Sequence, residues 1–577
     1  MGQYNLLDEP WIAVMPADGG RAETVSLLTL FREAHRYQRL AGEMVTQDFA
    51  VLWLLLAVLT TVFTRFDADG EPFPFVELDE RGRQTNDVDK DDLPGGARSY
   101  RKVMRNTWKI LWERGQFPDI VTTYLEKWRD RFYLFDESYP FYQVRIEDLI
   151  NEKAEQDSDG EFKSVILGKT INRTISESDH KVALFSPVSD SEKNKLQNAE
   201  FARWLIAAQN YLGVQDKGKF LEYPKTAEEK ISKGWLFELG GICISGETLF
   251  ETLMLNLVLE HPESQYRMTR QRPCWEFEPN EFLKKLMRSE QPDNLAELYT
   301  NWCRAIYVDP KSENISEKQI IAVKLRRLIL NQPLELMTIW NSPDKNNFSS
   351  PKVHHPEQAM WRSFGLITMD DAKKGQRRPG IIDWLNSDSI QEQISKKKIS
   401  VWAISMLAGG SSSSQIPVDE IVDVLNLNEM MVTDQSEEGW CVRINEAVVT
   451  TKAVVEGVYK NYIGDLAQIR NIGKMDKGKS DTKRKAFIEK QKEDLYARID
   501  EPFREWLAAI APGDDKDEQI HWWQDALKRL VLQRACEILD AANHRDFIGI
   551  TDDNDHTKNI ATAYNWFCAR LNRQFSN

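Results

Sequence analysis

The sequence has few cysteines and histidines, and this scarcity argues against several kinds of metal and redox protein. Six cysteines are spread over 577 residues, and none forms the Cys-x-x-Cys pair of a zinc site or a redox dithiol. The eight histidines include the pair His354-His355, which has no nearby cysteine or spaced carboxylate set. The sequence therefore predicts neither a metal nor a cofactor. We interpret the cysteines as buried thiols in a reducing cytosol; they are Cys243, Cys274, Cys303, Cys441, Cys536 and Cys568.

Long hydrophobic runs are lacking as well. The longest apolar run, residues 49–63, falls short of the about 20 residues that a helix needs to cross a bilayer. The first residues show no signal-peptide pattern of basic, apolar and small residues. We interpret the run as a buried helix and expect a cytoplasmic protein without a membrane partner.

Basic residues are too few to coat the surface with positive charge. Lysine and arginine total 75 against 90 aspartate and glutamate, which gives a formal net charge of −15. Any nucleic-acid site must therefore be a local basic or loop-borne patch. Apolar residues are plentiful, since 41% are hydrophobic and 18 are tryptophan, so the chain can build a large core. At about 100–200 residues per domain, the length indicates more than one compact unit.

The N-terminal part mixes strands, helices and long polar loops. Residues 4–14 and 24–27 predict two strands joined by a tight turn at Asp18-Gly19-Gly20. Apolar residues at helical spacing predict helices over residues 28–40, 45–63, 100–113, 120–131 and 199–212. Three long connections are either disordered or functional, and they cover residues 67–97, 152–196 and 341–356.

The C-terminal part consists of long amphipathic helices. The apolar spacing predicts helices over residues 443–470, 481–510, 518–542 and 558–572, separated by short segments with helix-breaking residues. Four helices joined by short loops indicate an antiparallel four-helix bundle. We therefore predict an α+β fold, with a mixed domain over residues 1–435 and a bundle domain over residues 436–577.

One segment matches a nucleotide-binding motif. Residues Gly473 to Ser480 fit the Walker A pattern G-x-x-x-x-G-K-[ST] at every position. A working P-loop needs a buried strand that delivers the glycine-rich turn to a helix N-terminus, where backbone N–H groups hold phosphate. The preceding residues, 462–470, instead resemble the end of an amphipathic helix. We favour a loop between helices and keep a P-loop NTPase centred on Lys479 and Ser480 as the alternative.

No other segment assembles a catalytic set. His544-Arg545-Asp546 resembles a kinase catalytic loop, but a glycine-rich G-x-G-x-x-G strand and a D-F-G companion are both missing. No G-x-S-x-G elbow occurs either. The sequence therefore predicts that the protein is not an enzyme.

A basic segment is more informative than these motifs. Between Arg470 and Lys492 there are nine lysines and arginines against three acidic residues. In an acidic protein this stretch is a candidate contact with a phosphate backbone, carried by Lys483, Arg484 and Lys485. The alternative is a solvated helix face.

Several short motifs, taken in chain order, resemble a known family. The opening Asn5-Leu6-Leu7-Asp8-Glu9-Pro10-Trp11-Ile12 is the most specific of them. Weaker matches are Tyr139-Pro140-Phe141-Tyr142-Gln143, Ala202-Arg203-Trp204-Leu205, Pro273-Cys274-Trp275-Glu276 and Ala359-Met360-Trp361-Arg362. Together they resemble the CasA family, the large subunit of the type I-E CRISPR surveillance complex Cascade.

The resemblance implies a non-catalytic DNA reader. Such a subunit joins the crRNA-containing Cascade subunits and recognises the protospacer-adjacent motif (PAM) in double-stranded target DNA. It helps to open the duplex for R-loop formation and provides the landing site for a separate CRISPR helicase-nuclease. A purely structural scaffold is a third possibility, and it predicts that loop mutations have no effect on DNA.

The resemblance also implies three DNA-contacting elements. A flexible loop with an aromatic tip corresponds to residues 152–196, with Phe185 as the tip. A glycine loop at the minor groove corresponds to residues 213–219, with Gly213, Lys217, Gly218 and Lys219 as contacts. A wedge hairpin corresponds to residues 406–415, where Ser414 and Gln415 follow a predicted strand over residues 399–407 and the turn-forming pair Gly409-Gly410. Without the resemblance this last segment is interpreted as a flexible polar loop. Lys345 is the candidate for the family's minor-groove lysine.

Overall fold

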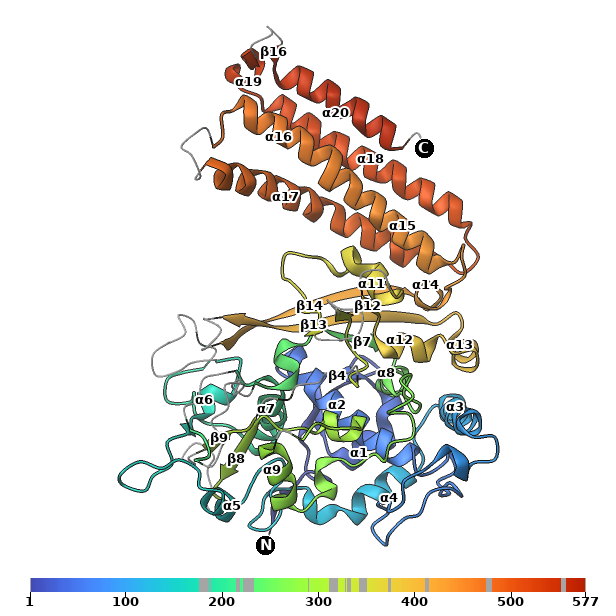
Figure 1. Ribbon diagram of the computed structural model, residues 1–577, viewed down its shortest axis with the longest axis vertical. Helices are drawn as coiled ribbons and strands as arrows, with labels where there is room; N and C mark the ends of the chain where they lie inside the picture. Colours follow the sequence, from blue (N-terminus) through green and yellow to red (C-terminus); the bar gives the residue numbers. More distant parts are fainter. Residues whose placement is uncertain are drawn as a thin grey trace. The chain divides into compact units, whose positions relative to one another are not determined.

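The computed structural model in Figure 1 describes residues 2–175, 186, 188–213, 218–221, 233–288, 290–310, 320–326, 328, 334–341, 350–371, 375–409, 415–473, 480–551 and 557–575. These residues form two compact units. The N-terminal unit comprises Met1–His354, Asp370–Ser395 and Ile399–Val424, and the helical unit comprises His355–Met369, Lys396–Lys398 and Leu425–Asn577. The single boundary after residue 435 stays a prediction, and in the structure the chain passes between the units more than once.

The N-terminal unit begins with the predicted strand-turn-strand motif. Strand β2 (Ile12–Pro16) pairs antiparallel with β3 (Glu23–Val25), and Gly19 adopts the positive φ of 84° that the turn between them requires. On its other edge β2 pairs with β4 (Tyr37–Leu40). The small sheet thus has the order β3-β2-β4.

The helix predicted over residues 28–40 is wrong in its second half. Helix α1 (Leu27–Glu33) ends after two turns, and a 3-10 turn, Ala34–Arg36, leads directly into β4. Tyr37 and Leu40 are buried in β4, whereas the two residues between them are exposed. This spacing also fits a helix face, and pairing with β2 decides in favour of the strand.

Helix α2 (Val45–Phe63) is the centre of the N-terminal unit. Every residue from Phe49 to Phe63 is buried, and α7 (Asn198–Tyr211) and α10 (Leu295–Tyr299) pack against the helix. Its length and hydropathy would also suit a membrane span, but such an apolar helix is equally the core of a compact unit. The predicted buried helix is confirmed.

The other elements of the N-terminal unit surround this core. The predicted helices are present as α3 (Ala97–Arg114), α4 (Ile120–Lys127) and α7. Further helices are α5 (Ile146–Asn151), α6 (Gly168–Ile171), α8 (Leu249–Asn256), α9 (Pro279–Met287), α12 (Gly380–Leu385) and α13 (Asp388–Ile394). Short strands pair as β1 (Gln3–Asn5) with β5 (Tyr133–Phe135), and as β11 (Ser350–Pro351) and β12 (Gln376–Arg377) on either side of β10 (Trp340–Asn341).

Two three-stranded sheets support the candidate site. One has the order β6-β9-β8 and consists of β6 (Val165–Ile166), β9 (Ile320–Lys324) and β8 (Arg304–Val308). The other has the order β14-β13-β7 and consists of β14 (Ile416–Asn428), β13 (Lys398–Gly409) and β7 (Gly241–Ser245). Strands β7 and β13 run antiparallel from the pair Ser400 and Ser245 to the pair Ile404 and Gly241. Strand β13 confirms the prediction for residues 399–407.

The helical unit contains the predicted bundle. Helix α15 (Trp440–Ala453) continues through a π-helical turn, Val454–Tyr459, into α16 (Lys460–Ile469), so the two form one long rod. The rod packs with α17 (Ser480–Ala509), α18 (Lys516–Asp540) and α20 (Ile560–Gln574). Smaller elements are α11 (Phe364–Thr368), α14 (Met430–Thr433), α19 (His544–Ile548), β15 (Ile550–Thr551) and β16 (Thr557–Lys558). The α+β fold class and the four long helices are confirmed.

Aromatic rings fill the core of the bundle. The Trp506 and Trp523 rings stack with centroids 5.4 Å apart, and Phe503 meets Trp523 edge-on at 4.7 Å. The indole Nε1 of Trp523 donates to Thr451 Oγ1 at 3.0 Å, which satisfies its buried N–H.

The prediction that all six cysteines are buried is partly wrong. Cys243, Cys274, Cys303 and Cys441 are buried, but Cys536 is exposed on α18 and Cys568 is half-buried on α20. The Cys536 thiol lies 3.1 Å from the Tyr564 hydroxyl. Both exceptions belong to helices of the bundle, where each helix buries only one face.

Candidate nucleic-acid interface

Gln415, the predicted wedge residue, directly precedes β14 in the N-terminal unit. Strand β14 is attached to the core helix through Glu420. The Glu420 carboxylate accepts hydrogen bonds from the backbone N–H groups of Val45 at 3.3 Å and Thr46 at 2.9 Å. The N–H groups in the first turn of a helix have no acceptor within the helix, and they carry the partial positive charge of the helix dipole. A carboxylate at this position is therefore stabilising. Strands β13 and β14 form the hairpin, and its second strand is therefore held against the start of α2.

The predicted glycine loop meets the hairpin at Gly213. Helix α7 ends at Tyr211, and two residues later a Cβ built on Gly213 would lie 2.3 Å from the carbonyl oxygen of Gln415. The same Cβ would lie 3.1 Å from Ile416 Cα. Any side chain would collide with backbone here, so the position requires glycine. The structure thus brings Gly213 and Gln415, two residues far apart in the sequence, into direct contact.

A buried arginine fixes the backbone at Gly213. The Arg304 side chain is 0% exposed, and its guanidinium donates to the carbonyl oxygens of Gly213 at 2.5 Å and Cys303 at 2.8 Å. The Gln209 side chain on α7 accepts from the Arg304 backbone N–H at 3.0 Å. Because these contacts join α7, the glycine loop and β8, they fix the position of the Gly213 backbone. Arg304 stands in no motif of the sequence that would mark it for this role.

The other end of the glycine loop is held by the sheet β6-β9-β8. A Cβ on Gly218 would lie 1.6 Å from Ser164 Oγ and 2.4 Å from Ser164 Cβ, and rotation of the serine side chain would not relieve the second clash, so this position also favours glycine. The Lys324 backbone N–H donates to Gly218 O at 3.2 Å, and the Glu155 N–H donates to Lys219 O at 2.9 Å. Lys219 is exposed. Both described ends of the predicted loop are therefore anchored on rigid elements.

The side chain of Gln415 is already engaged. Lys233 Nζ donates to Gln415 Oε1 and also contacts Glu238 Oε1 at 2.6 Å. Lys233 reaches this position because Gly234 packs against the end of α7, where its N–H donates to Leu212 O at 2.9 Å. The Lys233 side chain is 10% exposed. Gln415 was predicted as part of the wedge hairpin, and nothing in the sequence indicates this lysine partner.

Four further predicted contacts are not among the residues that the structure describes. Phe185, Lys217 and Ser414 lie outside the described residues, and so does Lys345. Gly213, Gly218, Lys219 and Gln415 are therefore the predicted site residues that the structure describes in this unit.

The basic stretch from Arg470 to Lys492 is partly neutralised within the helical unit. Arg470 pairs with the buried carboxylate of Asp546 at 2.7 Å, and this hydrogen-bonded guanidinium lowers the pKa of Asp546. Lys492 contacts Glu456 at 2.6 Å and Glu489 at 2.7 Å. These two cations hold the bundle together and leave little charge for an outside partner.

The three cations proposed to contact phosphate lie near the start of α17. Lys483 and Lys485 are exposed, whereas Arg484 is half-buried and its Nη2 donates to Gly464 O at 3.4 Å. In the Walker A segment, Gly473 has a φ of 78° and closes the turn after α16. The element before it is therefore a helix, whereas a P-loop requires a strand. Residues 474–479 lie outside the described part of the chain.

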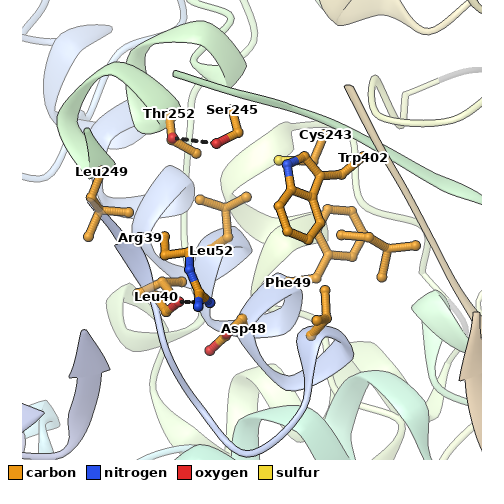
Figure 2. Close-up of a pocket in the computed structure, with 12 residues that line it drawn as sticks. Arg39, Leu40, Asp48, Phe49, Leu52, Cys243, Ser245, Leu249, Thr252 and Trp402 are labelled. Carbon is orange, nitrogen blue, oxygen red and sulfur yellow. Dashed lines mark hydrogen bonds between the residues drawn. The ribbon is translucent and has the colours of Figure 1, made fainter. Parts of the chain in front are cut away.

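A small apolar cavity lies beside the first strand of the hairpin. Figure 2 shows Trp402, Cys243 and Phe49 around it, with Asp48 and Arg39 on the opposite wall. Its volume is about 90 Å³. Burial raises the pKa of Asp48 to about 7, although the Gly42 N–H and the Arg39 guanidinium oppose this rise. Residues of β7, β13 and α2 line the cavity, so it lies where the hairpin packs on the core helix.

These features define a class of protein: a large α+β chain with a glycine loop packed on a hairpin and a separate helical bundle. The family model of CRISPR-associated protein Cse1 matches residues 5–534, and this chain belongs to that family. CasA/Cse1 of Thermus thermophilus is 27% identical over 280 residues, which cover 48% of this chain and 43% of the relative. The matched region thus spans less than half of that relative's length.

Solved structures share the fold over nearly the whole chain. Cse1 of Thermobifida fusca has a TM-score of 0.73 at 23% identity, with 99% of this chain and 98% of that chain covered. Cse1 of Acidimicrobium ferrooxidans has a TM-score of 0.71 at 20% identity, with 100% and 99% covered. A chain of a CRISPR RNA-guided surveillance complex has a TM-score of 0.67 at 15% identity, with 99% and 100% covered.

Proposed function

We propose that this chain is the large, non-catalytic subunit of a type I-E CRISPR surveillance complex, Cascade. In this role it assembles in the cytoplasm with the crRNA-containing subunits and recognises the PAM in double-stranded DNA. It then destabilises the adjacent duplex to start R-loop formation and recruits the helicase-nuclease. Family membership supports the place in a CRISPR system, and the finer roles are our proposal.

The observation that carries the proposal is the contact between Gly213 and Gln415. The resemblance assigns one residue to the minor groove and the other to the wedge, and these two tasks must occur at neighbouring base pairs. A backbone without side chains can approach the minor groove closely, where readout is degenerate and several related motifs are accepted. An inserted amide beside it can take the place of a displaced base edge.

The energetics suit a subunit that does not hydrolyse nucleotides. Opening one base step costs about 1.4 kcal/mol of stacking, and guide pairing then makes strand exchange nearly balanced. The wedge therefore has to lower only the first barrier. A net charge of −15 with local basic loops also favours brief binding at many sites.

Reconstitution tests the proposal. The chain should copurify with a crRNA-containing complex and confer binding to duplexes that bear one short motif beside the target. The chain alone should not hydrolyse ATP. A complex that assembles and binds equally well without this chain would contradict the proposal. ATP hydrolysis that disappears in Lys479→Ala would instead support the P-loop alternative.

A further inference from the structure

Helix α3 carries a row of basic side chains that the proposed motif-reading site does not use. Five cations recur at three- and four-residue intervals, so they occupy an arc of about 100° around the helix. We call this row the α3 stripe, and it consists of Arg98, Arg101, Lys102, Arg105 and Lys109. No aspartate or glutamate occurs between residues 97 and 109. The helix buries the neighbouring face, which carries Tyr100, Met104, Thr107, Trp108 and Leu111.

Three arginines share a single buried carboxylate at the edge of the stripe. The Glu260 side chain is 5% exposed and contacts Arg101 Nε at 2.7 Å, Arg267 Nε at 3.0 Å and Arg105 Nη2 at 3.3 Å. One carboxylate cannot neutralise three guanidinium groups. Burial and the repulsion from Arg101 and Arg105 lower the pKa of Arg267, although Glu260 opposes this shift. The cluster therefore has a surplus of positive charge that an added anion would relieve.

The outer part of the stripe is available to a partner. Arg98 and Lys102 are exposed, and neither forms an ion pair within the residues that the structure describes. Lys109 lies 3.8 Å from Glu113, which is a weak, exposed pair. In a chain with a net charge of −15, five cations on one helix face form a local basic patch.

We propose that the α3 stripe binds the phosphodiester backbone of duplex DNA without regard to sequence. The inference rests on the proposed function and adds to it a further DNA contact, separate from the Gly213–Gln415 site and from the three cations of α17. The stripe is about 16 Å long on a rigid helix, and a duplex presents about one phosphate charge per 1.7 Å of its axis. In Figure 1, α3 lies on the opposite side of the N-terminal unit from α6 and β9.

Duplex DNA fits this surface better than a single strand does. Proteins that hold single strands combine cations with exposed aromatic rings on which bases stack. Trp112, one turn beyond Lys109 on α3, is half-buried and already stacks on Trp108 at a centroid distance of 5.2 Å. The stripe therefore offers charge without a stacking platform. Its contribution is retention of DNA during the search for a motif.

The test uses the assembled complex with Arg98→Gln and Lys102→Gln combined. These positions leave the pairs with Glu260 intact, so the fold of the cluster is kept. The matched control is Lys284→Gln combined with Arg288→Gln, two exposed cations at the same spacing near α9 that pair with Glu152 and Glu290. Binding to duplexes with and without the motif is measured from 50 to 300 mM salt.

We expect the stripe variant to weaken binding on the order of tenfold at about 100 mM salt for both duplexes. The slope of log K against log salt should fall by about two. An unchanged slope, an equal effect of the control variant, or loss of crRNA or another subunit from the complex would overturn the assignment to duplex DNA. The proposed function is judged separately, since it fails if the wild-type complex shows no preference for any motif.

Discussion

The carbonyl oxygen of Gln415 occupies the space that a Cβ on residue 213 would need, at a distance of 2.3 Å. The glycine loop and the hairpin are packed backbone against backbone here, so neither can move toward the other. The side chain of Gln415 is held at the same place by Lys233, which is shared with Glu238. Before Gln415 can enter a duplex, its amide has to leave this lysine.

Replacing Gly213 by alanine tests the close contact. We expect Gly213→Ala to destabilise the N-terminal unit by about 1–3 kcal/mol, because backbone or hairpin must shift to admit the methyl group. Thermal melting and motif binding by the assembled complex measure the two effects. The control is Gly464→Ala, since a Cβ on that helical glycine meets open space. The control should leave the free energy of unfolding unchanged or raise it by up to about 1 kcal/mol, because alanine favours a helix more than glycine does. Equal behaviour of the two variants would contradict the packing.

Replacing Gln415 by alanine tests the wedge. We expect Gln415→Ala to slow R-loop formation on a fully paired duplex while leaving a target already unwound beside the motif almost unaffected. Lys233→Met should act in the opposite direction, because it releases the Gln415 amide while keeping an apolar stem of similar length. Stopped-flow measurements on the two substrates distinguish these outcomes. Equal defects of Gln415→Ala on both substrates would leave only a general contact.

Reversing charge at the start of α17 tests the basic stretch of the bundle. Lys483→Glu combined with Lys485→Glu should weaken DNA binding by the complex about equally for matched and unmatched motifs, since phosphate contacts carry no sequence information. Arg484 is better left in place, because its guanidinium contacts Gly464 O within the bundle. Lys528→Glu combined with Arg529→Glu on α18 changes the charge equally and should have the smaller effect. A loss confined to one motif would rule out a backbone contact.

The carboxyl group beside the cavity gives a pH prediction. Burial raises the pKa of Asp48 from 3.8 to about 7, so the folded protein holds this proton more tightly than the unfolded chain does. Stability therefore falls as pH rises through this range, because the unfolded chain ionises first. Asp48→Asn keeps an acceptor for the Gly42 N–H and removes the titration. We expect the melting temperature of the variant relative to wild type to rise by about 2–4 °C between pH 5 and pH 8. A constant difference would contradict the raised pKa.

Local patterns predicted the long helices well, because each pattern depends only on nearby residues. The continuous apolar run of α2 and the apolar faces of the bundle helices can be found without knowledge of their partners. Residues 37–40 show the limit, since Tyr37 and Leu40 fit a helix or a strand and only pairing with β2 selects the strand. The α3 stripe shows a different limit. Its spacing is visible in the sequence, but the convergence of three arginines on Glu260 is not.

The segments that form the candidate site could be predicted from the sequence, but the side chains that hold them in place could not. The resemblance identified Gly213 and Gln415, but Arg304 and Lys233 reach them from distant parts of the chain. Such partners carry no local signature, since an arginine or lysine in isolation is most often a surface residue. Glycine was the one usable signal. Gly218 and Gly234 both mark places where another chain segment leaves no room for a Cβ.

The carboxylate of Glu420, on β14, serves as the N-terminal cap of α2 and receives the Val45 and Thr46 N–H groups. Any displacement of the hairpin large enough to move Glu420 would leave these two amides without their acceptor. The amides in the first turn of α2 therefore report the position of the hairpin. Exchange of the Val45 and Thr46 amide protons with solvent would register the hairpin's movement from inside the protein, without a label on the surface that meets DNA.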